Sequence, residues 1–340
     1  MIPKLASGLV LGKMMPPHLG HLYLIGCALR QVERLFVVVE HVEGEPIPSA
    51  LRAAWVRALV PEAEVLHLER AMPQEPAAHP RFWALWREAL LGLAPAPPEV
   101  VFASETYGHR LARELGARFL PVDPGRQVVP VSGTAVRDDP EANARFLPAP
   151  VRAHYGLPAS LPAGPPRRVA LVGPESTGKS TLARALAKCL DARFVPEHAE
   201  TMIAAGVCDP SALTARDFED FARGQRASED TLASFGGAWL LCDSDALTTQ
   251  LYAERLLGDC PAWITAEAGA RRYPLTLLSA PDVPWTSDVH RVDRDGRAAF
   301  FERARAKLER LGRRYVVVDG GWAERQARAL AEIRALGEVD

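Results

Sequence analysis

The sequence feature that most constrains the fold is the motif GPESTGKS at residues 173–180. It fits the phosphate-loop pattern GxxxxGK[ST], and it lies between an apolar run that predicts a strand and a segment that predicts a helix. At average residue frequencies the pattern arises by chance in about one chain in a hundred of this length. The motif therefore predicts a parallel α/β domain around it.

The residues of this loop share one chemistry, which is to wrap closely around phosphates. Glycines let the backbone approach, and the start of the following helix points unpaired N–H groups at the ligand. Lys179 supplies charge for the β- and γ-phosphates, and the Ser180 hydroxyl is expected to bind Mg²⁺. We predict ATP contacts at Gly173, Glu175, Ser176, Thr177, Gly178, Lys179, Ser180 and Thr181.

Carboxylates after neighbouring strands complete this predicted site. Asp243 follows the apolar run 238–242, where it can hold the metal with Ser180; the alternative is a turn aspartate that caps the next helix. Asp245 and Glu197 are expected to contact the substrate. Either Glu197 or Asp243 can take up the hydroxyl proton, and the sequence does not choose between them.

Arginines recur in a polar segment that follows the predicted strand 275–278. Arg291 and Arg294, with Arg297, can close over ATP as a lid and neutralise charge on the transferring phosphoryl group. A solvated charged loop is an equal alternative. We include Arg291 and Arg294 among the predicted ATP-binding residues.

A second predicted phosphate site lies in GKMMPPHLGH, residues 12–21. His18 and His21 are three residues apart at a helix start, so both imidazoles can lie on one face near the positive end of the helix dipole. We expect them to bind ATP phosphates together with Gly12, Lys13 and Gly20.

A second element of that site, VSGTAVR, occupies residues 131–137. It offers the hydroxyls of Ser132 and Thr134, a permissive glycine and the cation of Arg137 before a helical stretch. The two elements in this order are more specific than either alone. They fit adenylyl transfer, which needs positioning and charge neutralisation but no covalent intermediate when the acceptor is already a phosphate.

The chain is too long for one ordinary core, at 340 residues, so we expect two domains. A proline-rich stretch at 158–168 is the predicted linker between domains 1–157 and 169–340. The fold class is α/β, with an N-terminal Rossmann-like nucleotidyltransferase domain and a C-terminal P-loop kinase domain, both with parallel sheets. The patterns predict strands at 5–11, 35–39, 64–68, 100–103, 169–172, 238–242, 275–278 and 315–318, and helices at 19–32, 49–59 (with Ser49 as its N-cap), 81–91 and 179–190.

Composition excludes several protein classes. A net charge of −2 without a basic stripe argues against a nucleic-acid partner. Five scattered cysteines without a CxxC pair support neither a zinc site nor a disulfide framework. Without a run of eighteen apolar residues or a signal peptide, we expect no membrane insertion and a cytoplasmic location.

The two N-terminal elements resemble the nucleotidyltransferase signatures GxFxPxHxGH and ISxTxxR, with Met14 in place of the aromatic and Val131 in place of the isoleucine. The second half looks like a nucleoside kinase. Together they resemble the NadR family, which joins nicotinamide mononucleotide adenylyltransferase to ribosylnicotinamide kinase. Further stretches also resemble that family: 104–108, 122–126, 217–225, 243–249 and 281–291.

The resemblance implies a bifunctional enzyme of NAD biosynthesis and salvage that binds ATP, nicotinamide mononucleotide, nicotinamide riboside and NAD, with Mg²⁺. It assigns His18, His21, Ser132 and Arg137 to the adenylyl transfer, and Lys179, Ser180 and Asp243 to the kinase. It also implies substrate contacts at Arg52 and at Trp86. Trp86 is the candidate for stacking on nicotinamide and Trp83 is its competitor, while a role for Trp86 in the core alone is an equal alternative. Because nothing precedes the first strand, we expect no DNA-binding repressor domain of the kind found in some relatives.

Two alternatives stay open. One is another nucleotidyltransferase–kinase fusion, acting on pantetheine or flavin compounds. The other is a regulatory protein that senses NAD or ATP without turnover. A GTPase is disfavoured, because the chain has no NKxD element. A homo-oligomer is compatible with the sequence, which does not decide the oligomeric state.

Overall fold

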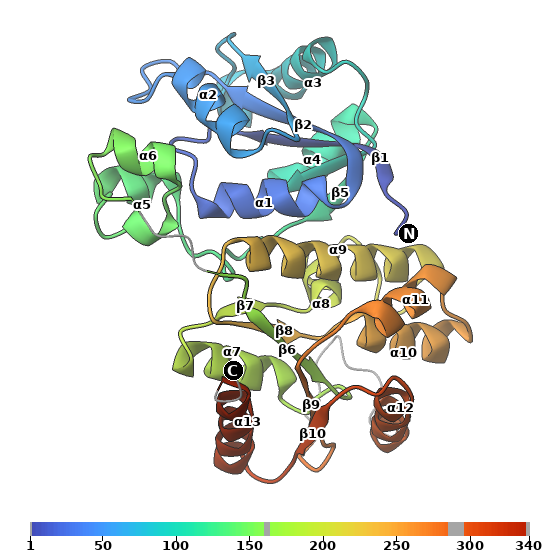
Figure 1. The fold of residues 1–340 in the computed structure, drawn as a ribbon. Coiled ribbons are helices and arrows are strands. Elements are labelled where there is room, and N and C mark those ends of the chain that lie inside the picture. The colour runs from blue at the N-terminus through green and yellow to red at the C-terminus, as the bar shows by residue number, and fades with distance from the viewer. Residues whose placement is uncertain (1, 160–163, 285–295, 338–340) are drawn as a thin grey trace. The chain divides into compact units, whose positions relative to one another are not determined.

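The computed structural model describes residues 2–159, 164–284 and 296–337. The chain divides into two compact units, one over residues 3–161 and the other over residues 162–340. Each unit is an α/β domain with its own five-stranded parallel sheet (Figure 1). The α/β fold class with parallel sheets is confirmed.

The N-terminal unit has the strand order β3-β2-β1-β4-β5. Strand β1 pairs with β2 on one side and with β4 on the other, so the chain reverses its direction of winding at β1. Ligands in such sheets bind beyond the carboxyl ends of the strands at this switch point. The elements are β1 (Leu5–Gly12), α1 (Leu19–Leu29), β2 (Val32–Glu40), α2 (Ser49–Leu59), β3 (Glu64–Leu68), η1 (Pro76–Ala78), α3 (Phe82–Leu93), β4 (Val100–Ala103), α4 (Tyr107–Leu115), β5 (Arg118–Pro121), α5 (Gly133–Asp138), η2 (Ala144–Phe146) and α6 (Ala149–His154).

The C-terminal unit repeats this plan with the order β10-β9-β6-β8-β7. Here β6 is the switch strand, paired with β8 and with β9. The elements are β6 (Arg167–Val172), α7 (Lys179–Cys189), β7 (Arg193–Val195), α8 (His198–Ala204), α9 (Ala215–Ser234), β8 (Trp239–Asp243), α10 (Ala246–Leu257), α11 (Ala262–Ala270), β9 (Leu275–Ser279), α12 (Arg297–Arg310), β10 (Tyr315–Val318) and α13 (Trp322–Gly337).

The central strands are apolar because both faces of each sheet are covered by helices. All four residues of β4 and all five of β9 are buried, as expected for strands inside a parallel sheet. Helices α7 and α13 pack against one cluster of buried side chains on the C-terminal sheet, and α10 and α12 pack against another. These rigid layers hold the loops after β1 and β6 in place.

Some predicted boundaries are wrong at one end. The helix predicted over 19–32 ends at Leu29, because Val32 pairs with Leu5 as the first residue of β2. Ser49 is not the N-cap of α2 but its first residue, and its N–H donates to the Glu45 carboxylate at 2.5 Å. Strand β6 begins two residues before its predicted start.

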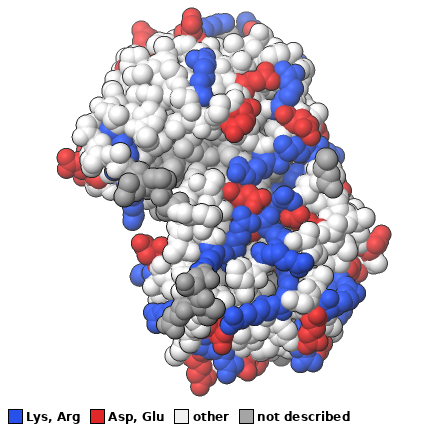
Figure 2. Space-filling view, in the orientation of Figure 1, with Lys and Arg blue, Asp and Glu red and all other residues white. Residues whose placement is uncertain are grey.

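Charged side chains are interspersed on the face shown in Figure 2, where Lys and Arg lie among Asp and Glu. Several form exposed ion pairs, such as Arg34 with Glu64 at 2.9 Å and Arg81 with Glu88 at 2.8 Å. Because water screens such exposed pairs, they add little to stability. Among the described helices, none combines the length and the apolar character needed to cross a bilayer.

Candidate active sites

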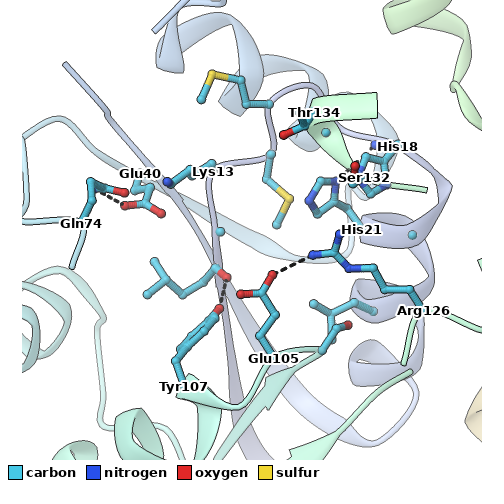
Figure 3. A pocket seen from close by; sticks show the side chains of 18 of the residues that line it. Lys13, His18, His21, Glu40, Gln74, Glu105, Tyr107, Arg126, Ser132 and Thr134 are labelled. Carbon is cyan, nitrogen blue, oxygen red and sulfur yellow. Dashed lines mark hydrogen bonds and ion pairs between the residues drawn. The ribbon is translucent and has the colours of Figure 1, made fainter. Parts of the chain in front are cut away.

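A cavity of about 610 Å³ opens at the carboxyl end of β1 in the N-terminal unit (Figure 3). Its wall combines the loop after β1, the start of α1, helix α3, the turn after β4 and the stretch 123–137. Both predicted N-terminal elements therefore line the same space, at the switch point of the sheet. The predicted ATP contacts Gly12, Lys13, His18, Gly20, His21, Ser132, Thr134 and Arg137 all lie on this wall.

The two elements are in direct contact. Arg137 Nη1 donates to the backbone carbonyl of Met15 at 2.6 Å, and Nη2 donates to Thr134 Oγ1 at 3.2 Å. A Cβ on Gly133 would lie 2.5 Å from the same Met15 oxygen, so only glycine allows this approach. Ser132 caps α5 by accepting the Ala135 N–H at 3.1 Å. The structure thus brings two motifs that are distant in the sequence together on one wall of the cavity. We call this wall the N-terminal cradle.

The two histidines stack at the start of α1. His18 is the N-cap, and its N–H donates to Nδ1 of His21 at 3.3 Å. The ring centroids are 3.8 Å apart, with 28° between the planes. Because Nδ1 of His21 accepts a hydrogen bond, the proton of its neutral ring sits on Nε2. The pair is placed to donate N–H groups to an anion.

Both imidazoles are neutral at neutral pH. Burial lowers the pKa of His21 to about 4, and the charge of Arg126 adds to this effect. Burial, His21 and Arg126 hold the pKa of His18 far below its usual range. A bound polyphosphate would oppose these shifts, since negative charge favours the imidazolium. In the free protein they are uncharged donors.

Residues that the sequence left without a role form the mouth of the cavity. Arg126 Nη2 donates to Glu105 Oε1 at 2.8 Å, and the Tyr107 hydroxyl donates to the Leu11 carbonyl at 2.9 Å (Figure 3). The carboxylate of Asp123 accepts three backbone N–H groups within 3.2 Å, which holds the turn that carries Arg126. These residues follow β4, which pairs with the switch strand, and β5, which pairs with β4. This position at the carboxyl ends of the strands is the signal that could have found them.

Another part of the cavity is partly aromatic. Trp86 is 5% exposed, packs into the core and donates its Nε1–H to the Pro73 carbonyl at 3.0 Å. Trp83 is less buried and also lines the cavity. Nearby, Gln74 Nε2 donates to Glu40 Oε2 at 3.1 Å, and burial raises the pKa of the Glu40 carboxyl. Either indole can reach a bound ring, so both assignments stay open.

Arg52, a predicted substrate contact, is instead fully buried behind the cavity wall. Its guanidinium donates to the backbone carbonyls of Ile47, Lys13 and Glu40 and to the Glu45 carboxylate. Each nitrogen of its guanidinium therefore donates a hydrogen bond to another group of the protein. Arg52 holds Lys13 and the chain after β2 in place and does not line the cavity.

The phosphate loop of the C-terminal unit has the backbone that its glycines predict. Gly173 has φ 151°, and a Cβ there would lie 2.8 Å from the Ser279 carbonyl. Gly178, with φ 78°, precedes α7. Lys179 Nζ donates to the Pro174 carbonyl at 2.9 Å, across the loop. This bond holds the Lys179 side chain against the loop.

Two carboxylates, Asp243 and Glu197, lie close enough to this lysine to interact with its charge. Asp243 is fully buried at the end of β8, and burial raises its pKa while Lys179 and Ser180 oppose the rise. Within the described residues neither of its oxygens has a hydrogen bond of normal geometry. Burial also raises the pKa of Glu197 to about 7, with Lys179 opposing and Asp243 adding to the rise. The two carboxylates lie at the ends of paired strands, since Val195 pairs with Cys242.

This donor set fits Mg²⁺. The buried Asp243 carboxylate and the Ser180 hydroxyl are hard oxygen ligands, and Mg²⁺ usually keeps several waters and substrate phosphates besides one or two protein ligands. Within the part of the chain that the structure describes, no cluster of three or more His, Cys, Asp or Glu side chains is arranged to hold a metal by itself. The predicted pair Ser180 and Asp243 stays a proposal.

Comparison with known proteins finds a matching family model and several similar proteins. A family model described as an AAA domain matches residues 168–325. The chain is similar to the trifunctional NAD biosynthesis/regulator protein NadR of Escherichia coli, with 24% identity over 84% of this chain and 71% of that protein. The NadR protein of Salmonella typhimurium is 24% identical over 83% and 70%. Solved structures of NadR protein in complex with NR, and in complex with NAD and AMP-PNP, align at 20% and 21% identity over 98% of this chain and 97% of theirs, with TM-scores of 0.44.

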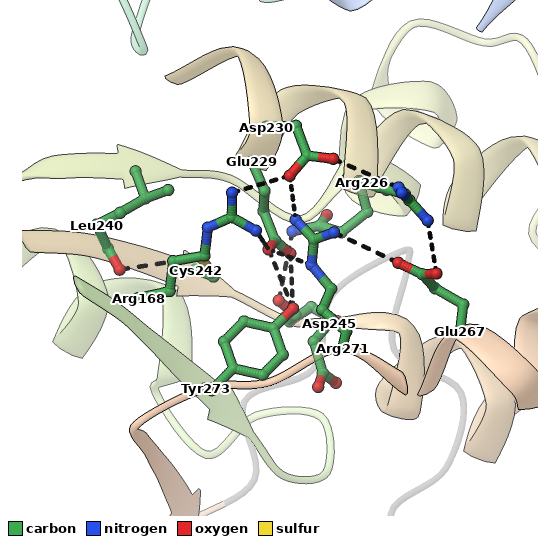
Figure 4. Close-up of polar contacts among 12 residues, drawn as sticks. Arg168, Arg226, Glu229, Asp230, Leu240, Cys242, Asp245, Glu267, Arg271 and Tyr273 are labelled. Carbon is green, nitrogen blue, oxygen red and sulfur yellow. Dashed lines mark hydrogen bonds and ion pairs between the residues drawn. The ribbon is translucent and has the colours of Figure 1, made fainter. Parts of the chain in front are cut away.

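Asp245, predicted to contact substrate, has a structural role instead. It is fully buried and caps α10, where Oδ1 accepts the Thr248 N–H at 3.1 Å. Its Oδ2 accepts from Arg313 Nη1 at 2.6 Å. It belongs to a partly buried network of ion pairs and hydrogen bonds (Figure 4), which also contains Arg168, Arg226, Glu229, Asp230, Glu267, Arg271 and Tyr273. The helix-capping alternative considered for Asp243 applies to Asp245.

The predicted lid arginines Arg291 and Arg294 lie outside the described residues. Arg297, at the start of α12, is 8% exposed and donates to the carbonyls of Val283 at 3.1 Å and Ser176 at 3.4 Å. Arg297 therefore links Ser176 of the phosphate loop to Val283, which follows β9.

Proposed function

We propose that this chain belongs to the NadR family and carries out two reactions of NAD biosynthesis. The N-terminal unit transfers the adenylyl group of ATP to nicotinamide mononucleotide, which gives NAD and pyrophosphate. The C-terminal unit phosphorylates nicotinamide riboside with ATP, which gives the mononucleotide used by the first unit. The observation that carries this proposal is a turn after the switch strand of each sheet, β1 in one and β6 in the other, whose residues are suited to bind phosphates.

The N-terminal cradle suits attack of a phosphate oxygen on the α-phosphorus of ATP. In that step a new P–O–P bond forms and pyrophosphate leaves with its electron pair. The neutral imidazoles of His18 and His21 would donate hydrogen bonds to the phosphates, and Arg137 would add positive charge. Preorganised donors of this kind stabilise the charge that develops in the transition state. The aromatic wall with Trp83 and Trp86 supplies a surface for the nicotinamide ring.

The C-terminal site suits attack of the riboside 5′-hydroxyl on the γ-phosphorus. We assign Glu197 as the base that takes the hydroxyl proton, because its pKa of about 7 matches that task. Lys179 would neutralise the β- and γ-phosphates. Mg²⁺, held by Ser180 and Asp243, would offset phosphate charge. In this assignment Asp243 binds the metal and Glu197 accepts the proton of the hydroxyl.

The direct test is to incubate the full chain with Mg-ATP and nicotinamide riboside and to follow mononucleotide, NAD and pyrophosphate. Lys179→Ala should abolish riboside phosphorylation and leave adenylylation of added mononucleotide intact, whereas His21→Ala should do the reverse. Lys188→Ala, exposed on the same helix as Lys179, and His154→Ala, exposed on α6, are matched controls that should change neither rate.

Three results would contradict the proposal. Loss of both activities in either well-folded variant would remove the division of labour between the units. Turnover of phosphopantetheine or flavin mononucleotide in place of nicotinamide mononucleotide would support the other fusion. Binding of ATP and NAD without any turnover would support a sensor.

A further inference from the structure

The indole of Trp322 lies exposed beside the phosphate loop, and neither proposed reaction uses it. Trp322 is the first residue of α13, and 45% of the residue is exposed. A Cβ built on Gly178 would lie 3.9 Å from Cζ3 of the indole. Gly178 directly precedes α7, whose first N–H groups point at the place of the phosphates. A large aromatic side chain thus borders the nucleotide site.

The turn that carries this indole is tied to the phosphate loop. Arg325 is 2% exposed; its Nε donates to the Gly320 carbonyl at 2.9 Å and its Nη1 to the Thr177 carbonyl at 3.4 Å. The Gly320 N–H donates to Asp282 Oδ2 at 2.7 Å. Because these bonds connect the turn to the loop backbone, Trp322 is held at a defined place relative to bound phosphates.

The strand order gives the bound nucleotide a direction. Asp243 and Glu197 follow β8 and β7, which lie on one side of β6 and its loop. Trp322 follows β10, which lies on the other side of β6 beyond β9. Phosphoryl transfer happens at the carboxylates, so the γ-phosphate must lie on their side. The α-phosphate and the nucleoside then extend away from them, toward the side of Trp322.

We propose that Trp322 is the stacking platform for the base of the nucleoside triphosphate bound at the phosphate loop. This inference rests on the proposed function, since it takes that loop as the nucleotide site. Stacking uses the π-face that every base has, so the indole supplies affinity for the base without reading its hydrogen-bonding edge. It explains why an indole stays exposed at this point.

The test measures the contribution of the base to binding separately from that of the phosphates. The full chain carrying His21→Ala, which weakens the first nucleotide site, is titrated calorimetrically with Mg-AMP-PNP and with Mg-tripolyphosphate, which has no base. Trp322→Ala should weaken the binding of AMP-PNP about ten-fold, as expected for loss of one base–aromatic stack. It should leave the binding of tripolyphosphate unchanged. Trp322→Phe should retain most of the affinity. Leu256→Ala, which also removes an exposed apolar side chain, should change neither constant.

Two results overturn the inference. One is an unchanged dissociation constant for AMP-PNP in Trp322→Ala. The other is an equal loss of affinity for both probes, which would indicate a structural role of the indole. Lys179→Ala distinguishes these from failure of the proposed function. Lys179→Ala should weaken the binding of both probes, because it removes the charge that faces the phosphates. If it leaves both unchanged, the loop is not the nucleotide site, and the proposed function falls together with this inference.

Discussion

The guanidinium of Arg137 donates a hydrogen bond of 2.6 Å to the backbone carbonyl of Met15, 122 residues earlier in the chain. This bond joins the loop after β1 to the last turn of α5. Both segments contribute to the cavity wall, so their relative position sets the distance between the histidines and the hydroxyls of the second element. Several consequences of this contact can be measured.

Arg137→Ala should lower the rate of adenylyl transfer by about 10²–10³-fold, the usual effect of losing one transition-state donor. Arg137→Lys should recover little, because an ammonium cannot donate to both Met15 and Thr134 as the guanidinium fork does. Steady-state kinetics with nicotinamide mononucleotide checks both variants. The exposed Arg145→Ala, nearby in the same unit, is the control, and an equal loss in that variant would disprove a specific role for Arg137.

Gly133→Ala should push the two elements apart, because its Cβ would lie 2.5 Å from the Met15 oxygen. A displacement of about 1 Å at such a site can cost about 100-fold in rate. Gly92→Ala in α3 meets nothing within 4 Å and should leave the rate unchanged, with a small gain in stability from helix propensity. Equal rates for both variants and the parent chain would show that this approach is not needed.

The N-terminal unit should lose stability as the pH falls from about 6.5 to about 4. An unfolded histidine takes up a proton near pH 6.5, whereas the pKa of native His21 is lowered to about 4. In that window the unfolded state binds more protons, so its free energy falls relative to the native state, by about 2 kcal/mol at pH 5 for His21 alone. His18 acts in the same direction.

Calorimetric melting of the full chain at neutral and acidic pH checks this expectation. The double variant His18→Asn and His21→Asn should show a smaller drop in Tm of the N-terminal unit than the parent chain. The exposed His154→Asn should behave like the parent. If the double variant loses as much stability on acidification as the parent, the buried imidazoles are not the cause.

The kinase rate should rise with pH up to about 7 and then level off. Glu197 must be deprotonated to accept the hydroxyl proton, and burial raises its pKa to about 7. Glu197→Gln should lower kcat by about 10²–10⁴-fold and remove this dependence. The pH profile of riboside phosphorylation is the measurement.

Glu200→Gln is the matched variant for this profile. Glu200 is exposed on α8, and its negative charge contributes to the raised pKa of Glu197. Its removal should shift the rising limb to lower pH and keep most of the maximal rate. A profile that stays unchanged in both Glu197→Gln and Glu200→Gln would assign the proton transfer elsewhere.

Local signals predicted much of both sites. The phosphate loop with Lys179 and Ser180 follows from contiguous residues between a strand and a helix, and the place of His18 and His21 on one face follows from their spacing at a helix start. Asp243 and Asp245 show where such reasoning stops. Both follow the same apolar run, but Ser244 has φ 78°, which breaks the strand alternation and turns Asp245 onto the N-terminus of α10.

By itself the sequence determined the α/β class, the place of two turns between a strand and a helix, and most strand positions, because these depend on periodicity and on short motifs whose residues are neighbours in the chain. Only the tertiary structure decided which side chains meet from distant segments: Arg137 with Met15, Arg126 with Glu105, Arg325 with the phosphate loop, and Arg52 with backbone carbonyls instead of a substrate. For Arg52 and Arg325, which are buried, the physical reason is that a buried arginine must find acceptors for its N–H groups; Arg126 and Arg137 are less buried and meet partners that lie at neighbouring strand ends. Those acceptors come from whichever strand ends the sheet order brings together.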